Sequence, residues 1–241
     1  DALQYARKKG ILEVTSLTNG RALPDLLIEK LVRAQPNWIS FSIDGMGSDY
    51  NRIRGAISQD NGKDPFKIVI NNIRKIVRIR ERLGFTLPQI RTNTIYPPIY
   101  KNPERYRTLM EKNGVGLVTV NELLDFRGSE IPESAILNNW FCTYPFQRLI
   151  ISASGVIMAC PGAHNEDKEL VLGRYGGVTL KEAWNSKKIK RIRMLHSTNR
   201  RKEILACRYC RHGSLKHGVK WIPDDWDMKN MRWINKAWRN G

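Results

Sequence analysis

No apolar run in this sequence approaches the roughly 20 consecutive residues that a helix needs to cross a bilayer. The chain also lacks the charged and then apolar opening of a secretory signal segment. Its first residue is Asp1 rather than Met, inside a stretch (DALQYARKKG) typical of a helix. We therefore expect a cytoplasmic protein with no membrane partner, and a chain whose upstream part is missing.

Acidic residues are scarce relative to basic ones. The 241 residues include 23 Asp and Glu against 41 Lys and Arg, a net charge of +18. Such a field attracts nucleic acid, anionic membrane surfaces or acidic small molecules, and charge alone does not choose among them. The densest stretch, 187–202, holds eight basic residues and no acidic one, which favours a solvated helix face. The hydrophobic fraction of 41% is ordinary for a folded protein, so disorder is not expected.

Cysteines are few, and in a chain without a secretion signal they argue against a disulfide framework. Cys207 and Cys210 form a Cys-x2-Cys pair, in which a tight turn directs both sulfurs to one side. Cys142 and Cys160 stand at the two ends of an expected β-hairpin, whose antiparallel pairing brings them close. Four converging thiolates suit tetrahedral zinc or a [4Fe–4S] cluster, and spacing does not separate the two. Unrelated buried thiols are the alternative, and the Cys-x2-Cys pair argues against it.

The front half of the chain alternates β-rich and helical patterns, and no internal repeat is visible. The patterns predict strands at 11–17, 38–43, 90–95 and 115–120, helices from 24 onward, at 65–83 and at 103–112, and a loop from 44 to 64. Strands separated by helices pair in parallel through right-handed crossovers. That permits an open doubly wound sheet or a β/α barrel, and periodicity does not decide between them.

The composition changes after about residue 128. Residues 129–139 are typical of a linker, and two short β segments, 148–152 and 156–159, are joined by Ala153-Ser154-Gly155 as in a hairpin. A helix is predicted at 180–195. The basic tail from 212 onward holds four of the seven tryptophans: Trp221, Trp226, Trp233 and Trp238.

A series of motifs in this second half resembles a known domain. In order, they are Cys142-Thr143-Tyr144-Pro145-Phe146, LIISASG, Cys160, Leu172-Gly173, LKEAWNS and Cys207-Arg208-Tyr209-Cys210. Over about 70 residues this order and spacing resembles the SPASM/Twitch auxiliary domain of radical S-adenosylmethionine (SAM) enzymes.

The resemblance implies one auxiliary [4Fe–4S] cluster, ligated by Cys142, Cys160, Cys207 and Cys210. Longer members of that family continue with further cysteines, but Lys216 stands where the next would fall and none follows Cys210. With four cysteine ligands no iron is left open for substrate, so the implied role is electron transfer.

The front half is similar to the same family. VTSLTNG, FSIDG followed by Tyr50-x3-Arg54-Gly55, Phe66 and LPQIRTN resemble successive strand ends of a radical SAM barrel. The implied fold is α/β: a partial (β/α) TIM-type barrel with its first strands missing, in residues 1–128. A small α+β iron–sulfur domain with a β-hairpin follows in 129–241, ending in the Trp-rich tail.

Two motifs of that family are absent: the Cys-x3-Cys-x2-Cys that holds the catalytic cluster, and a Gly-Gly-Glu-Pro segment. We expect truncation to explain this. The full-length protein, with SAM and a second [4Fe–4S] cluster, is then expected to cleave SAM reductively to a 5′-deoxyadenosyl radical that abstracts hydrogen from substrate, as an oxidoreductase or maturase. Expected partners are a small-molecule, sugar or peptide substrate and an electron donor such as flavodoxin or ferredoxin.

Candidate SAM contacts follow from position, because active groups of β/α barrels lie at the carboxyl ends of strands. Ser42 and Arg54 are candidates for the SAM carboxylate, since a guanidinium can grip a carboxylate with two hydrogen bonds. Asp44 is a candidate acceptor from a ribose hydroxyl, and Asn19 and Arg91 are candidates on position alone. The structural alternatives are packing for Ser42, a salt bridge for Arg54, and turns for Asp44-Gly45 and Asn19-Gly20.

The competing function is a basic zinc-binding module that contacts nucleic acid. Net charge and the Cys-x2-Cys pair favour it, whereas the dispersed charge and the lack of zinc-finger spacing or an RNA-binding signature do not. Nucleic acid is therefore not expected as a partner. The four histidines, His164, His196, His212 and His217, make no ligand pattern with one another.

Overall fold

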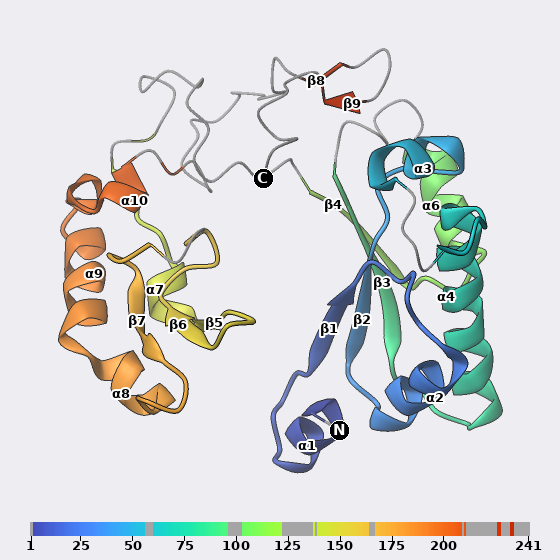
Figure 1. Cartoon of the computed structure of the whole chain (residues 1–241), viewed down its shortest axis with the longest axis horizontal. Helices are drawn as coiled ribbons and strands as arrows, with labels where there is room; N and C mark the ends of the chain where they lie inside the picture. The colour runs from blue at the N-terminus through green and yellow to red at the C-terminus, as the bar shows by residue number, and fades with distance from the viewer. Residues whose placement is uncertain are drawn as a thin grey trace. The chain divides into compact units, whose positions relative to one another are not determined.

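The computed structural model describes residues 2–55, 60–95, 103–121, 137, 139–163, 167–208 and 210, together with 226–227 and 232–233 (Figure 1). The chain divides into two compact units, each with its own sheet. The domain boundary predicted at 128/129 falls outside the described residues, so it stays a prediction.

The first unit is built on a four-stranded parallel sheet. Its strands are β1 (Thr15–Thr18), β2 (Trp38–Ser42), β3 (Gln89–Ile95) and β4 (Leu117–Asn121), in the order β1-β2-β3-β4. All four were predicted from the sequence, although β1 begins later than expected. The register aligns Ser42 with Asn93, and Asn93 with Thr119.

The helices of this unit are α1 (Ala2–Lys8), α2 (Asp25–Ala34), α3 (Ser48–Arg54), α4 (Pro65–Arg82) and α6 (Pro103–Glu111). The prediction of an uninterrupted loop from 44 to 64 was wrong, because α3 lies inside it. Its Gly, Asp and Ser content is typical of a loop, but Tyr50 of α3 is fully buried in the core, so tertiary packing stabilises the helix.

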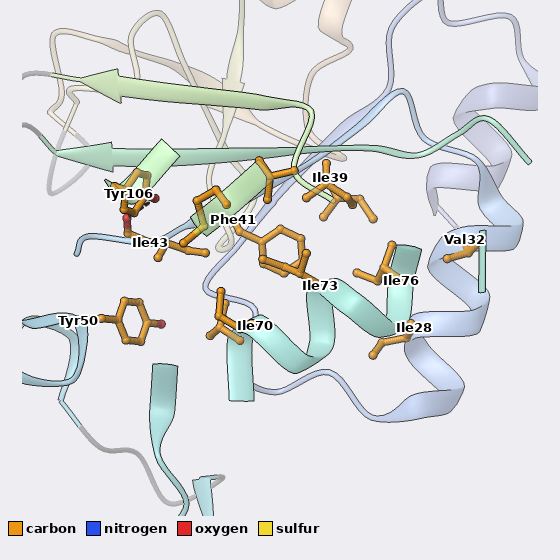
Figure 2. Packing of buried hydrophobic residues seen from close by; sticks show 14 residues of the cluster. Ile28, Val32, Ile39, Phe41, Ile43, Tyr50, Ile70, Ile73, Ile76 and Tyr106 are labelled. Carbon is orange, nitrogen blue, oxygen red and sulfur yellow. Dashed lines mark hydrogen bonds between the residues drawn. The ribbon is translucent and has the colours of Figure 1, made fainter. Parts of the chain in front are cut away.

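One hydrophobic core joins the sheet to α2, α4 and α6 (Figure 2). Alternate residues of β2 and its end, Ile39, Phe41 and Ile43, point into it, as do Ile73 and Ile76 of α4. Side chains of a strand alternate between faces, so the residues between them in β2 take the opposite face. That face also carries Leu17, in register with Ser40, and Leu117, in register with Arg91. The two leucines are 65% and 42% exposed, respectively.

The strand order decides a choice that the sequence left open. Right-handed crossovers that always move to the next strand place every helix on the same face of the sheet. A doubly wound sheet reverses direction at a switch point and carries helices on both faces. The described strands run in chain order and helices α2, α4 and α6 share one core (Figure 1), so this sheet is singly wound.

The second unit pairs a small antiparallel sheet with short helices. Its elements are α7 (Tyr144–Gln147), β5 (Ile150–Ile151), β6 (Val156–Met158), β7 (Val171–Arg174), α8 (Leu180–Asn185), α9 (Lys187–Ser197), the 3₁₀ helix η4 (Arg201–Glu203) and α10 (Leu205–Arg208). The predicted hairpin is confirmed as β5 and β6, with Gly155 at φ +84° in its turn. Strand β7, which pairs with β6, was not predicted.

The single helix predicted at 180–195 is two helices, and this prediction was wrong. Ser186 has an extended backbone (ψ 153°), and its side chain accepts from the Ile189 N–H as the N-cap of α9. A serine between two amphipathic segments carries this signal, because its hydroxyl satisfies an unpaired amide of the first turn.

In the tail, β8 (Trp226–Asp227) and β9 (Arg232–Trp233) form a two-residue antiparallel pair that aligns Trp226 with Trp233. Trp221 and Trp238 lie outside the described residues. Of the helices that the structure describes, none is long and apolar enough to cross a membrane.

Candidate functional site

The four cysteines of the second unit line one pocket. Cys142 precedes α7, Cys160 follows β6, Cys207 lies in α10 and Cys210 follows it. All four are half-buried, and none forms a disulfide. The structure thus brings together the four residues that the sequence grouped as ligands of one centre.

Local hydrogen bonds hold the cysteine backbones around the pocket. The Cys207 N–H donates to the Ile204 oxygen (2.9 Å) and the Cys210 N–H to the Cys207 oxygen (3.3 Å), which forms the tight turn of the Cys-x2-Cys pair. The Gly162 N–H lies 3.2 Å from the Cys160 sulfur, which it can stabilise as a thiolate. These contacts fix where the sulfurs of Cys160, Cys207 and Cys210 enter the pocket.

The pocket is largely apolar, which shapes the chemistry of its thiols. Trp140, Pro145, Leu170 and Ala206 line it beside the cysteines. Burial raises the pKa of the Cys142 thiol and that of Cys207, and the neighbouring Cys210 thiol raises both further. Thiols in such a place become thiolates when a cation binds them.

Within the described part of the chain, no three His, Cys, Asp or Glu side chains lie close enough together to hold a single metal ion.

Two buried nitrogen-bearing side chains also line this pocket, Arg201 and His196, each 2% exposed. Nε and Nη2 of Arg201 and Nε2 of His196 are buried and have no hydrogen-bond partner among the residues that the structure describes. A four-thiolate iron–sulfur cluster is anionic and offers sulfur acceptors, so the donor set and the unused N–H groups fit it. Burial, and then the charge of Arg201, lowers the pKa of His196 to about 4.

Sequence reasoning missed both residues. Arg201 and His196 fall in the basic stretch 187–202, which was predicted to be a solvated face. Helical spacing offered a signal for His196, because it continues the buried stripe of α9 formed by Ile189 and Ile192. Arg201 carried no such signal.

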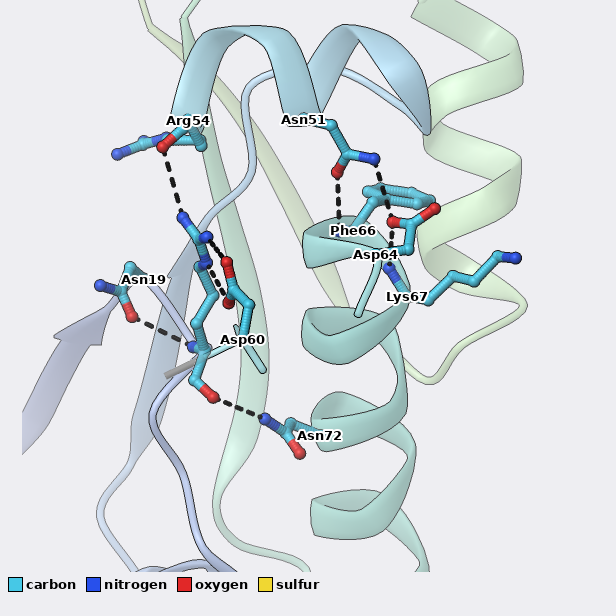
Figure 3. Close-up of polar contacts among 9 residues, drawn as sticks. Asn19, Asn51, Arg54, Asp60, Asp64, Phe66, Lys67 and Asn72 are labelled. Atoms are coloured by element: carbon cyan, nitrogen blue, oxygen red, sulfur yellow. Dashed lines mark hydrogen bonds and ion pairs between the residues drawn. The ribbon is translucent and has the colours of Figure 1, made fainter. Parts of the chain in front are cut away.

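Of the predicted SAM contacts, Ser42 and Asp44 lie at the carboxyl end of β2, and Asn19 follows the carboxyl end of β1. Asp44 is 5% exposed and forms an ion pair with Arg54, the last residue of α3. The Asn19 side chain accepts from the Arg21 N–H (3.1 Å), a local turn contact (Figure 3). Ser42 ends β2. Asp44 and Arg54 are therefore brought together in a salt bridge, the alternative given for Arg54, and Asn19 makes the turn contact given as its alternative. The assignment of these residues to SAM stays a prediction.

Arg91 lies deeper in the sheet than the other candidates. It aligns with Ser40, two residues before the level of Ser42, and its Nε donates to the Ser40 hydroxyl (2.7 Å). The residues in register with Ser42 are Asn93 and Thr119, and the Thr119 hydroxyl donates to the Asn93 Oδ1 (2.7 Å). Neither was selected from the sequence, because register across strands is not visible there.

A buried network fixes the backbone near these candidates (Figure 3). Arg21 and Asp60 form an ion pair, and Arg21 Nη1 also donates to the backbone oxygen of Arg54 (3.3 Å). Asn72 of α4 donates to the oxygen of Gly20 (2.8 Å). The turn after β1, the end of α3 and the middle of α4 are thus held together by polar contacts.

Comparison with known proteins finds a family match within the second unit. Residues 142–211 match the SPASM family, an iron–sulfur cluster-binding domain. This confirms the predicted SPASM resemblance. No curated protein matches the chain. Among solved structures, a crystal structure of BtrN in complex with AdoMet and 2-DOIA is similar over 87% of this chain and 97% of that chain. The sequence identity is 13% and the TM-score is 0.34, and these values do not establish a shared fold.

Proposed function

We propose that residues 142–211 bind one [4Fe–4S] cluster through Cys142, Cys160, Cys207 and Cys210, and that this cluster transfers electrons in a radical SAM enzyme. The observation that carries the proposal is the single pocket lined by all four cysteines, inside the segment that matches the SPASM family. Four thiolate ligands leave no iron open, which favours electron transfer over substrate binding.

We propose that the first unit is part of a (β/α) barrel that binds SAM. Its singly wound sheet, with helices on one face, supports this. Ser42 and Arg54 are proposed to bind the SAM carboxylate. Arg54 keeps a buried Nε without a partner among the described residues while its Nη2 pairs with Asp44. The chemistry that SAM supplies in such enzymes is reductive cleavage to a carbon radical that abstracts hydrogen from substrate.

The metal content of the chain tests the cluster. Anaerobic reconstitution with iron and sulfide should give a brown protein with equal iron and sulfide in [4Fe–4S] stoichiometry. The double variant Cys207→Ala/Cys210→Ala should bind neither, because two of four ligands are lost. Stoichiometric zinc without sulfide would contradict the proposal and favour the zinc-binding nucleic-acid module.

The SAM contact is tested by substituting Arg54 conservatively. Arg54→Lys keeps a positive charge beside Asp44 but removes the Nε donor, so SAM should bind about tenfold more weakly, the size of one charged hydrogen bond. Arg52→Lys is the matched control, since Arg52 lies on the same helix and pairs with Asp49 in an exposed salt bridge. Equilibrium dialysis with labelled SAM measures both. Equal affinity for SAM in the two variants would show that Arg54 does not bind the SAM carboxylate.

A further inference from the structure

Arg201 is a charged side chain almost entirely out of water, 2% exposed. Its Nη1 donates to the backbone oxygens of Cys207 (2.7 Å) and Cys210 (3.3 Å), and its Cζ lies 5.4 Å from the centre of the Trp140 ring. These contacts leave Nε and Nη2 unused, since neither has a hydrogen-bond partner within the described residues. A buried guanidinium with two unused donors is strongly unfavourable unless an anionic acceptor meets it.

His196 repeats this arrangement from α9. Its Nδ1 accepts from the Cys142 N–H (3.2 Å), so in the neutral ring the proton is on Nε2. That Nε2 is buried and has no partner in the described part of the chain. Both residues contact the backbone of cluster cysteines with one nitrogen and line the same pocket with the rest of the side chain.

We propose that Arg201 and His196 donate these unused N–H groups to sulfur atoms of the bound cluster and so raise its reduction potential. The inference rests on the cluster proposed above. An electron added to the cluster increases its negative charge, and hydrogen bonds to sulfur and a nearby positive charge stabilise the reduced form more than the oxidised one. Both are positioning residues that act on the potential of the cluster without ligating iron.

The test measures the midpoint potential of the reconstituted 241-residue chain by electron paramagnetic resonance during a redox titration. His196→Asn keeps an acceptor near the Cys142 N–H and removes the Nε2 donor. Arg201→Met removes the charge, and Arg201→Lys keeps it with fewer donors. We expect the equilibrium constant for cluster reduction to fall about tenfold in His196→Asn, which corresponds to about 59 mV for one electron. It should fall further in Arg201→Met. Arg201→Lys should lie between wild type and Arg201→Met.

Lys190→Met is the matched control, because it removes one charge from the exposed side of α9 and should leave the potential unchanged. Electron–nuclear double resonance should also show exchangeable protons coupled to the cluster in wild type, and one of these couplings should be lost in His196→Asn. If Arg201→Met fails to load iron, the potentials of His196→Asn and Arg201→Lys test the inference in its place. Loaded variants with the wild-type potential and proton coupling overturn the inference, whereas a wild-type chain that takes up no iron overturns the cluster itself.

Discussion

At the scale of single residues, Arg21 and Asp60 show how a charged pair can organise the first unit. Their side chains are 4% and 2% exposed, and Arg21 Nε donates to the Asp60 Oδ1 (3.0 Å). Each charge compensates the other in a place where water cannot, so removing one leaves the other buried and unpaired. Lys75 and Asp25 also form a salt bridge, but both of their side chains are exposed to water.

Asp60→Ala should therefore lower the free energy of unfolding by about 3–5 kcal/mol, the usual effect of breaking a buried pair. Asp25→Ala, its matched control, should cost about 0–1 kcal/mol because its pair is exposed and screened. Urea denaturation followed by circular dichroism measures both. Similar losses of unfolding free energy in the two variants would show that the buried Arg21–Asp60 pair stabilises the fold no more than the exposed pair does.

At the scale of elements, α4 illustrates how a local signal begins a helix. Asp64 is its N-cap: the carboxylate accepts from the Lys67 N–H and from the Asn51 side chain, both at 3.1 Å. The Asn51 hydrogen bond, and then the Lys67 N–H, lowers the pKa of Asp64 below its ordinary value of 3.8. The folded state thus favours the ionised form more than the unfolded state does.

Asp64→Ala should cost about 1 kcal/mol at neutral pH, as is typical for an N-cap. Because the folded pKa is depressed, the charge-dependent part of this stability is present above pH 3.8 and is lost as pH falls through the folded value. Asp64→Asn keeps a capping oxygen without a titrating group, so its unfolding free energy should lack that acid-sensitive part. Denaturation series between pH 2.5 and 7 compare the three proteins; an Asp64→Asn profile parallel to wild type would contradict the assignment.

At the scale of the whole molecule, the two units have separate hydrophobic cores. One comprises residues of the parallel sheet and its helices, and the other comprises residues of β6, α9 and their neighbours. Among the residues that the structure describes, none is shared between the two cores, and all four cysteines belong to the second unit. Metal binding adds to folding free energy only where the ligands are.

Scanning calorimetry should therefore show two unfolding transitions, of which cluster loading raises only that of the second unit. The Cys207→Ala/Cys210→Ala chain should show no such rise, with the first transition unchanged. The Asp60→Ala substitution identifies the transitions, because it should lower only the one that belongs to the parallel sheet. A single transition that moves as a whole on loading would mean that the units unfold together.

The grouping of the cysteines around one pocket was predictable because part of its signal is carried by residue type and short spacing. A Cys-x2-Cys turn and a hairpin are local structures, and α4 likewise follows from a cap and an apolar stripe within 18 residues. The elements that were missed had weak or contradictory local signals. α3 has the composition of a loop, and β7 pairs with β6 across a bulge.

The sequence by itself determined the alternation of strands and helices, the hairpin and the four cysteines, all set by neighbours along the chain. Only the tertiary structure decided that the sheet is singly wound, that Asn93 and Thr119 stand level with Ser42, and that Arg201 and His196 face the cysteine pocket. Arg21 and Asp60 are 39 residues apart, and His196 contacts the backbone of a residue 54 positions earlier. Burial and hydrogen bonding between such distant groups arise when the chain packs, and no periodicity within one segment encodes them.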